Sequence, residues 1–260
     1  MKTDKKNRVV DFIAPVSAIA AILIIWYLCS EKEVVPRYML PTPGDVLKAF
    51  AVNFPVLLNQ SVVTLQEAVY GLLIGIVIAF IMAVLMDRFN FVYKAFYPLL
   101  VISQTIPTIA IAPLLVLWMG FGMAPKITLV VITTFFPITI GLLDGYRNID
   151  PDAVNLLRSM GAGRMKIFRY VKFPSAVEPF FSSLKVSASY SVVGAVVSEW
   201  LGGFEGLGVY MTRVRKAYAF DKMFAVIIFI SLVSLILMLI VSIIEKVSMP
   251  WKKKTDKLSK

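Results

Sequence analysis

Residues 150–174 read DPDAVNLLRSMGAGRMKIFRYVKFP, a polar and basic stretch between two long apolar runs. It carries too many charges to cross a bilayer as a helix. Asp150 fits the N-cap of a helix, Pro151 suits its first position, and Gly161 suits a left-handed turn at its end. The pattern predicts two short helices joined at Gly161, the second one stopped by Pro174. A membrane protein that keeps such a cationic helical pair outside the bilayer presents a surface for a soluble partner, which indicates energy coupling and not an active site.

Each of the two short helices is expected to have an apolar and a polar face. The apolar residues at helical spacing are Val154, Leu157, Met160, Ile167, Phe168 and Val171. The cationic residues expected to face outward are Arg164, Lys166, Arg169 and Lys172. The competing interpretation is an ordinary loop made basic by the topology of the membrane. The regular helical spacing favours the helical pair, because a passive loop needs no defined apolar face.

The rest of the chain is predicted to be an all-α polytopic membrane protein. Of its 260 residues, 58% are hydrophobic, and several apolar runs approach the roughly 20 residues that cross a bilayer as a helix. Six spans are expected, at residues 11–30, 61–86, 91–118, 124–145, 178–200 and 223–246. The third is the least regular, because it contains Pro98, Pro107 and Pro113, and proline interrupts helical hydrogen bonding.

A short amphipathic helix is expected before the second span. The Pro41–Asp45 cluster breaks the chain, and Val46, Leu47, Phe50 and Phe54 then recur at helical spacing. Such a helix suits the outer membrane interface, where it would orient the second span.

The distribution of Lys and Arg predicts that both termini are cytoplasmic. The tails and loops on that side (1–10, 87–94, 146–172 and 246–260) hold 18 basic residues, whereas the opposite loops hold 8. The net charge of +11 thus follows membrane topology and does not indicate nucleic acid. The predicted organisation is a cytoplasmic tail at 1–10, a transmembrane domain at 11–246 that contains segment 150–174, and a basic cytoplasmic tail at 247–260.

Composition also excludes several kinds of chemistry. The chain has no histidine, so the commonest metal ligand and general base is missing, and its one cysteine, Cys29, cannot form an internal disulfide. No Gly-Lys dipeptide occurs, so there is no Walker A loop for ATP. No metal site and no catalytic residue are predicted. An integral membrane enzyme and an ion-coupled secondary transporter remain as alternatives of other classes, but the catalytic cluster or internal repeats they need are not seen.

Polar residues at membrane depth are the candidates for a solute pathway. They are expected to face a cavity or a partner, because burying them in lipid is costly. The candidates are Ser103, Gln104 and Thr105 beside Pro107, and Ser198, Glu199 and Trp200 near the end of the fifth span. Glu199 could instead be structural, paired with Arg213 or Arg215, and Trp200 could be an interfacial anchor.

Segment 150–174 resembles the coupling motif of ABC-importer permeases. That motif runs Glu-Ala-Ala, three residues, Gly, nine residues, Ile, one residue, Leu-Pro. This chain keeps Gly161, Val171, Phe173 and Pro174 at the same spacing, and it departs at Asn155-Leu156-Leu157, which replaces Glu-Ala-Ala. The resemblance implies contact with an ATPase through Asp152, Val154, Leu157, Met160, Gly161, Ala162, Arg164, Phe168, Val171, Phe173 and Pro174.

Three further stretches resemble the nitrate/sulfonate/taurine/thiamine-precursor branch of these permeases. They are MLPTPGDVLKAF at 39–50, SQTIPTIAIAPLLVLWMGFG at 103–122 and GAVVSEWLGGFEGLGVYM at 194–211. The resemblance implies a bacterial inner-membrane permease of the type I importer fold that pairs with a second copy, two ATPase subunits and an external binding protein. ATP and Mg²⁺ would bind only the ATPase, and this chain would bind no cofactor. Residues 199–218 most resemble permeases for hydroxymethylpyrimidine-type thiamine precursors, with a sulfonate, taurine or nitrate permease as the alternative.

Overall fold

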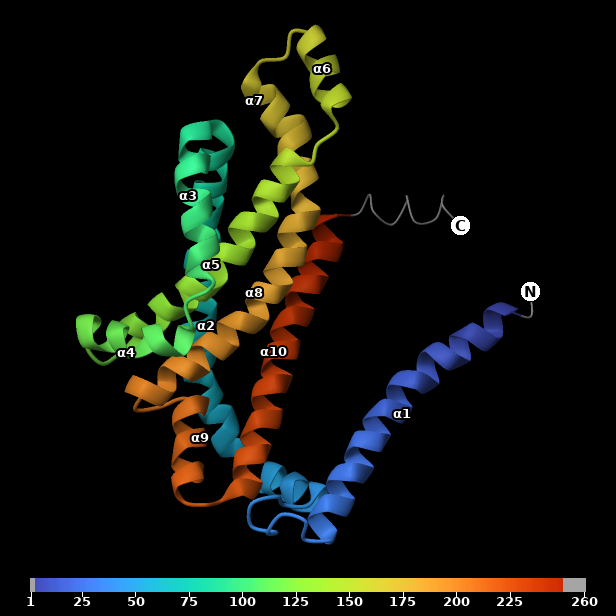
Figure 1. Cartoon of the computed structure of the whole chain (residues 1–260), viewed down its shortest axis with the longest axis vertical. Helices are drawn as coiled ribbons and strands as arrows, with labels where there is room; N and C mark the ends of the chain where they lie inside the picture. The colour runs from blue at the N-terminus through green and yellow to red at the C-terminus, as the bar shows by residue number, and fades with distance from the viewer. Residues whose placement is uncertain (1–2, 250–260) are drawn as a thin grey trace. The chain divides into compact units, whose positions relative to one another are not determined.

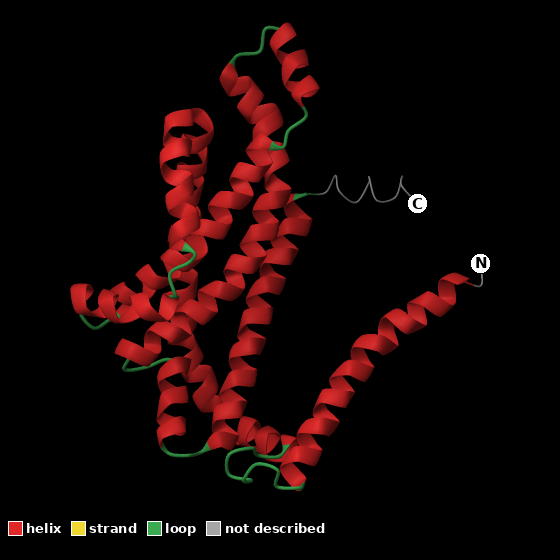
Figure 2. Cartoon of the chain, viewed as in Figure 1, coloured by secondary structure: helices red, strands yellow, loops and turns green. Residues whose placement is uncertain are grey.

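The computed structural model describes residues 3–249, and side chains from residue 14 onward. Within this range the chain is helical and contains no strand (Figure 2). The helices are α1 (Thr3–Glu31), α2 (Pro43–Arg88), α3 (Asn90–Ser103), α4 (Thr108–Met119), α5 (Met123–Arg147), α6 (Pro151–Ser159), α7 (Arg164–Ile167), the π-helical turn η1 (Phe168–Lys172), α8 (Phe173–Gly202), α9 (Leu207–Lys216) and α10 (Phe220–Ser248). The basic run of the predicted C-terminal tail lies outside the described residues.

The number of membrane spans agrees with the sequence. Five helical stretches are long and apolar enough to cross a membrane, namely the part of α1 from Ala14, α2, α5, the rod from α7 to α8, and α10. A sixth span results if α3 and α4, which bend by 102° at a short break, are counted together. The all-α polytopic fold class is therefore confirmed.

The break between α3 and α4 lies in the span predicted to be least regular (Figure 1). Of its three prolines, only Pro107 coincides with the break; Pro98 and Pro113 lie inside helices. Pro107 has extended backbone angles and precedes the first residue of α4. Proline also disfavours the helical conformation in the residue before it, so the chain ends one helix and starts another here.

The amphipathic helix expected before the second span is not separate from that span but forms the first part of α2. Residues 43–88 form one helix of 46 residues, with Pro55 inside it. The prediction of a boundary was wrong because Asn59, Gln60 and Ser61 are polar but compatible with a helix, and nothing between Pro55 and them terminates it. Proline removes one backbone hydrogen bond, which a long helix tolerates.

The described part of the chain forms two compact units, residues 3–59 with 210–229 and residues 60–209 with 230–249. In the first unit, Val46 and Ala49 of α2 pack against Ala225 of α10. The indole of Trp26 stacks on Phe224 with 5.5 Å between ring centroids. Its Nε1 atom donates a hydrogen bond of 3.0 Å to the carbonyl of Pro41, which fixes the loop between α1 and α2.

The second unit has its core between α2, α5 and α8. Met86, Ile138, Leu143, Tyr146 and Ala188 are among its buried residues. Helices α5 and α8 lie side by side (Figure 1), and small residues let their backbones approach closely. A Cβ atom added to Gly141 of α5 would collide with Ser183 of α8, and one added to Gly145 would collide with Ala176. This close pair carries the helical segment that follows α5.

Candidate functional site: the coupling segment and a solute cavity

The segment between α5 and α8 begins as the sequence predicts. Asp150 is the N-cap of α6, and its Oδ1 atom accepts a 2.9 Å hydrogen bond from the backbone N–H of Asp152. Pro151 takes the first helical position, and Asp152 places a negative charge at the positive end of the helix dipole. Figure 1 shows α6 and α7 at the end of the α5–α8 pair, connected by a short turn.

The end of α6 is a Schellman motif centred on Gly161. The backbone N–H of Ala162 donates to the carbonyl of Leu157, and that of Gly161 donates to the carbonyl of Arg158, both at 2.9 Å. Gly161 has φ +78°, the left-handed conformation that glycine adopts without a steric penalty. The predicted helix end is confirmed.

The apolar residues of the pair divide into an inner and an outer set. Val154 and Ile167 are buried and hold the pair against the rest of its unit. Met160 was predicted to continue the inner stripe, but it is 74% exposed, since α6 ends at Ser159 and the chain turns away. Leu156, Met165 and Tyr170 of the same segment are also exposed. An exposed apolar group on a polar helical tip is typical of a surface that contacts another protein.

One of the four cationic residues expected to face outward, Lys172, instead forms an ion pair inside the protein. Arg164, Lys166 and Arg169 are exposed, as predicted. Lys172 is half-buried, and its Nζ atom donates to both carboxylate oxygens of Asp87 at 2.6 and 2.8 Å. This ion pair connects the start of α8 to the end of α2.

Pro174 does not stop the second helix. From Arg164 to Gly202 the backbone stays helical, and residues 168–172 form a π-helical turn directly before the proline. A π-helical turn holds one more residue per hydrogen-bonded ring than an α-helix, and this irregularity lets the helix continue past Pro174. The prediction failed because the π-helical turn accommodates the proline, which a regular α-helix at this position would not do without a kink.

Glu199 lies in a buried polar cluster. It is 1% exposed, and its carboxylate accepts hydrogen bonds from the hydroxyl of Thr64 at 2.7 Å and the backbone N–H of Gly208 at 2.6 Å. The same hydroxyl oxygen of Thr64 accepts from the backbone N–H of Leu207 at 2.9 Å. Gly206 has φ +120°, and a Cβ atom there would collide with the carboxylate. A glycine is therefore required at this position, because it lets the backbone approach the carboxylate of Glu199 closely.

A second buried carboxylate beside this cluster has a charged partner. The Nζ atom of Lys126 in α5 donates to Oε1 of Glu67 in α2 at 2.6 Å, and both side chains are almost fully buried. Glu67 thus has a structural role, because its ion pair connects α2 to α5. Lys126 was missed as a site residue because it stood at the predicted end of a span, where a lysine is ordinary.

A cavity of about 270 Å³ lies at the bend between α3 and α4, with α5 and α8 as its other walls. Its polar side chains are Ser103, Gln104, Thr108, Thr133 and Tyr190. Two of the predicted pathway residues, Ser103 and Gln104, thus meet at one cavity. Thr133 and Tyr190 were missed, because single hydroxyls within apolar runs have no spacing that distinguishes them.

The other predicted pathway residues do not line this cavity. Thr105 is exposed next to it, and its hydroxyl donates to the carbonyl of Ile102 at 2.8 Å. Ser198 is buried, and its hydroxyl donates to the carbonyl of Ala195 at 2.7 Å. Trp200 is 38% exposed, which suits an interfacial anchor as well as a pathway.

Long apolar helices, a polar cavity at a broken span and an exposed helical tip define a membrane transport subunit. The chain matches the family of binding-protein-dependent transport system inner membrane components over residues 71–248, and it belongs to that family. It is a permease of the ABC-importer class, as the motif predicted. This membership argues against the secondary-transporter alternative.

Similar proteins place the chain in the predicted nitrate/sulfonate/taurine/thiamine-precursor branch of these permeases. It is 35% identical to a probable ABC transporter permease protein of Haemophilus influenzae, over 88% of this chain and 93% of that one. It is 32% identical to the formylaminopyrimidine transport permease protein ThiX of Halalkalibacterium halodurans, over 95% and 99%. Weaker similarity extends to permeases named for riboflavin, aliphatic sulfonates, nitrate and taurine.

Solved structures agree with the fold. An amino acid ABC transporter, crystallised with histidines, superposes with a TM-score of 0.60 at 17% identity, over 76% of this chain and 94% of that one. The inward-facing methionine transporter MetNI gives 0.58 at 17% identity, over 74% and 93%. The type I importer permease fold predicted from the sequence is confirmed.

Proposed function

We propose that two copies of this chain form the pathway of an importer that is driven by a separate ATPase and supplied by an external binding protein. The observation that carries the proposal is the helical tip at α6 and α7. It is held from inside by Val154 and Ile167 and ended by the Schellman motif, while Met160 and Met165 stay exposed. A tip held in this way can transmit a partner's movement to α5 and α8, because residues 148–150 join α6 to α5 and α7 continues through η1 into α8.

The orientation of the chain is part of this proposal. The side that carries segment 150–174 is the basic side by the count of Lys and Arg, which supports placing it and both termini in the cytoplasm of a bacterial cell. The division into a tail at 1–10, a transmembrane domain at 11–246 and a tail at 247–260 stays a prediction.

Affinity purification in mild detergent tests the importer complex. We expect a soluble ATPase to co-purify in a one-to-one ratio with this chain, as two plus two subunits require, and chemical cross-linking to join two copies of the permease. Purification of folded permease without an ATPase, under conditions that preserve a known importer complex, would contradict the proposal.

For the solute, we infer an uncharged pyrimidine of the thiamine-precursor type. The formylaminopyrimidine permease ThiX is similar over nearly the whole chain. The cavity at the α3–α4 bend supports the inference, because no Lys or Arg is among its lining residues. A pathway for sulfonate, taurine or nitrate would be expected to present a cation to the anionic group. The cavity instead offers hydroxyls and the amide of Gln104, which donates and accepts hydrogen bonds as an aminopyrimidine does.

Gln104 is the residue of this cavity best suited to a passing solute. Ser103 and Thr133 donate their hydroxyl protons to backbone carbonyls at 2.7 and 2.9 Å. Within the described part of the chain, the side-chain amide of Gln104 makes no hydrogen bond. Its four hydrogen-bonding positions therefore remain for water or solute.

Replacing Gln104 with alanine is expected to lower uptake of a labelled hydroxymethylpyrimidine about fivefold, the effect of one lost hydrogen bond of about 1 kcal/mol. Uptake is measured in proteoliposomes that contain the ATPase and an excess of loaded binding protein. Gln66→Ala is the matched control, because Gln66 is exposed on α2 and does not line the cavity. Equal uptake by the two variants would remove Gln104 from the pathway. Wild-type transport of taurine but not of the pyrimidine would overturn the inferred solute.

A further inference from the structure

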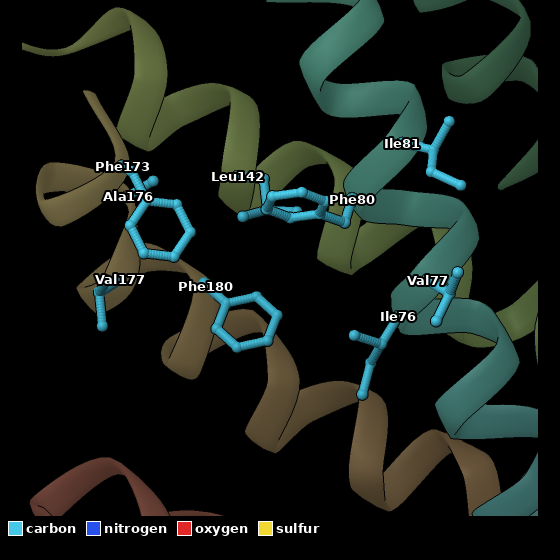
Figure 3. A pocket seen from close by; sticks show the side chains of 9 residues that line it. All are labelled: Ile76, Val77, Phe80, Ile81, Leu142, Phe173, Ala176, Val177 and Phe180. Carbon is cyan, nitrogen blue, oxygen red and sulfur yellow. The ribbon is translucent and has the colours of Figure 1, made fainter. Parts of the chain in front are cut away.

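An apolar groove runs along the second unit between α2 and α8, with α5 as its floor. Its volume is about 330 Å³, and every residue that lines it is apolar. Figure 3 shows the rings of Phe80, Phe173 and Phe180 around a central space, with Leu142 of α5 behind them. A groove without a single polar group cannot bind the polar solute proposed above, because nothing in it replaces the solute's hydrogen bonds to water.

A basic hollow of about 430 Å³ adjoins the groove at the end of α2. Arg88, Arg158, Arg164 and Lys172 contribute four cationic groups to it, and Asp87 is its only acidic group. Asp87 is already paired with Lys172. The three arginines have no ion-pair partner among the residues whose side chains are described. The hollow therefore carries an excess of positive charge that nothing in this part of the chain neutralises.

The two spaces are consecutive along the same two helices. On α2 the groove ends at Ile81 and the hollow begins at Val84, one turn further on. On the other side the hollow ends at Lys172 and the groove begins at Phe173. The ring of Phe173 lies between them, with its centroid 6.3 Å from that of Phe80 and 6.5 Å from that of Phe168.

We propose that the groove and the hollow together bind one glycerophospholipid with an anionic headgroup. An acyl chain occupies the groove, and the arginines of the hollow bind the phosphate, a group that guanidinium recognises with two parallel hydrogen bonds. Basic pockets beside membrane helices are suited to such headgroups.

The dimensions of the site fit a lipid better than a free anion. From Ile76 to Arg88, α2 rises by about 18 Å, close to half of the hydrocarbon thickness plus the interface. Arg88 lies at the end of the span, where the phosphates of a bilayer are found, and the groove extends from there toward the membrane interior. Free phosphate would use the hollow alone and leave the groove empty. The bound lipid would connect the end of α2 to α6 and α7, because Arg88 lies on α2, Arg158 on α6 and Arg164 on α7.

Native mass spectrometry of the full-length chain in detergent tests the proposal. The probes are palmitoyl-oleoyl phosphatidylglycerol, the matching phosphatidylcholine and inorganic phosphate. We expect one phosphatidylglycerol to be retained in preference to phosphatidylcholine. The double substitution Arg158→Gln, Arg164→Gln should weaken this binding about 30-fold, because each basic residue near an anionic surface contributes roughly a fivefold effect. Arg169→Gln is the matched control, since Arg169 is exposed on η1 and does not line the hollow.

A second pair of variants tests the groove. Val177→Trp fills it and should prevent retention of phosphatidylglycerol, whereas Val186→Trp, on the same helix but outside the groove, should not. Equal retention of both lipids, equal loss in the Arg169 control, or binding unaffected by Val177→Trp would each overturn the proposal. So would displacement of the lipid by inorganic phosphate at equal concentration, or by assembly with the ATPase, since the hollow would then belong to a free anion or to the protein partner. The proposal does not rest on the solute or on the importer complex.

Discussion

Replacing Lys126 with methionine is expected to lower the free energy of unfolding of the protein by about 3–5 kcal/mol. Lys126 and Glu67 form an ion pair of 2.6 Å between α5 and α2, and their side chains are 6% and 0% exposed. Removing the ammonium leaves the carboxylate of Glu67 buried without a charged partner, next to the cluster of Glu199. Methionine has a similar length and fills the space, so the loss comes from electrostatics and not from a cavity.

Reversible unfolding in mixed detergent micelles, followed by tryptophan fluorescence, measures this change. The double variant Glu67→Gln, Lys126→Met should recover most of the loss, because it removes both charges together. Lys185→Met is the control. Lys185 pairs with Glu245, but its side chain is 30% exposed, so the expected loss is about 1 kcal/mol or less. If Lys126→Met is no more destabilising than Lys185→Met, the pair does not hold α2 and α5 together.

The ion pair also shows what the sequence could not predict. Glu67 and Lys126 are 59 residues apart, and Thr64 and Glu199 are 135 apart. Each residue has an ordinary explanation by itself: a carboxylate or a lysine near the end of a span is a common topological feature. Their pairing depends on how the helices pack, and no local spacing encodes it.

Local signals, by contrast, predicted the local structure well. Asp150 caps α6 and Gly161 ends it, because both depend on the backbone conformation of a few neighbouring residues. Proline was the least reliable signal. Pro107 breaks a span, whereas Pro55 and Pro174 lie in continuous helical stretches. The cost of a proline depends on its position in the helix and on whether neighbouring turns can adjust, and neither is visible in the pattern.

The candidate pathway was predicted only in part for a similar reason. Ser103 and Gln104 were found because they lie next to Pro107, a visible irregularity. Thr133 and Tyr190 complete the same cavity from α5 and α8, but each stands alone in an apolar run. Only the packing of α5 and α8 against the α3–α4 bend brings them together.

Replacing Gly161 with valine is expected to reduce ATP-driven uptake at least tenfold while hydrolysis by the ATPase continues. The cost arises from the backbone, because no atom lies within 4 Å of the position that a Cβ atom would take. At φ +78° an L-residue loses about 1–2 kcal/mol, and a β-branched side chain is the least tolerant. The Schellman motif would open, and the exposed tip at Met160 would no longer be held in a fixed position relative to α5 and α8.

Gly163 provides a matched control two residues away. It also has open space around its Cβ position, but its φ of −71° and ψ of 168° are extended angles that valine adopts readily. Gly163→Val should therefore transport normally, and Gly161→Asn should retain most activity, because asparagine tolerates the left-handed conformation. Uptake and ATP hydrolysis are measured together in proteoliposomes that contain the full complex. Wild-type uptake in Gly161→Val, or an equal loss in Gly163→Val, would show that this turn does not couple the ATPase to the pathway, because both substitutions add the same side chain in open space and only Gly161 requires the left-handed conformation.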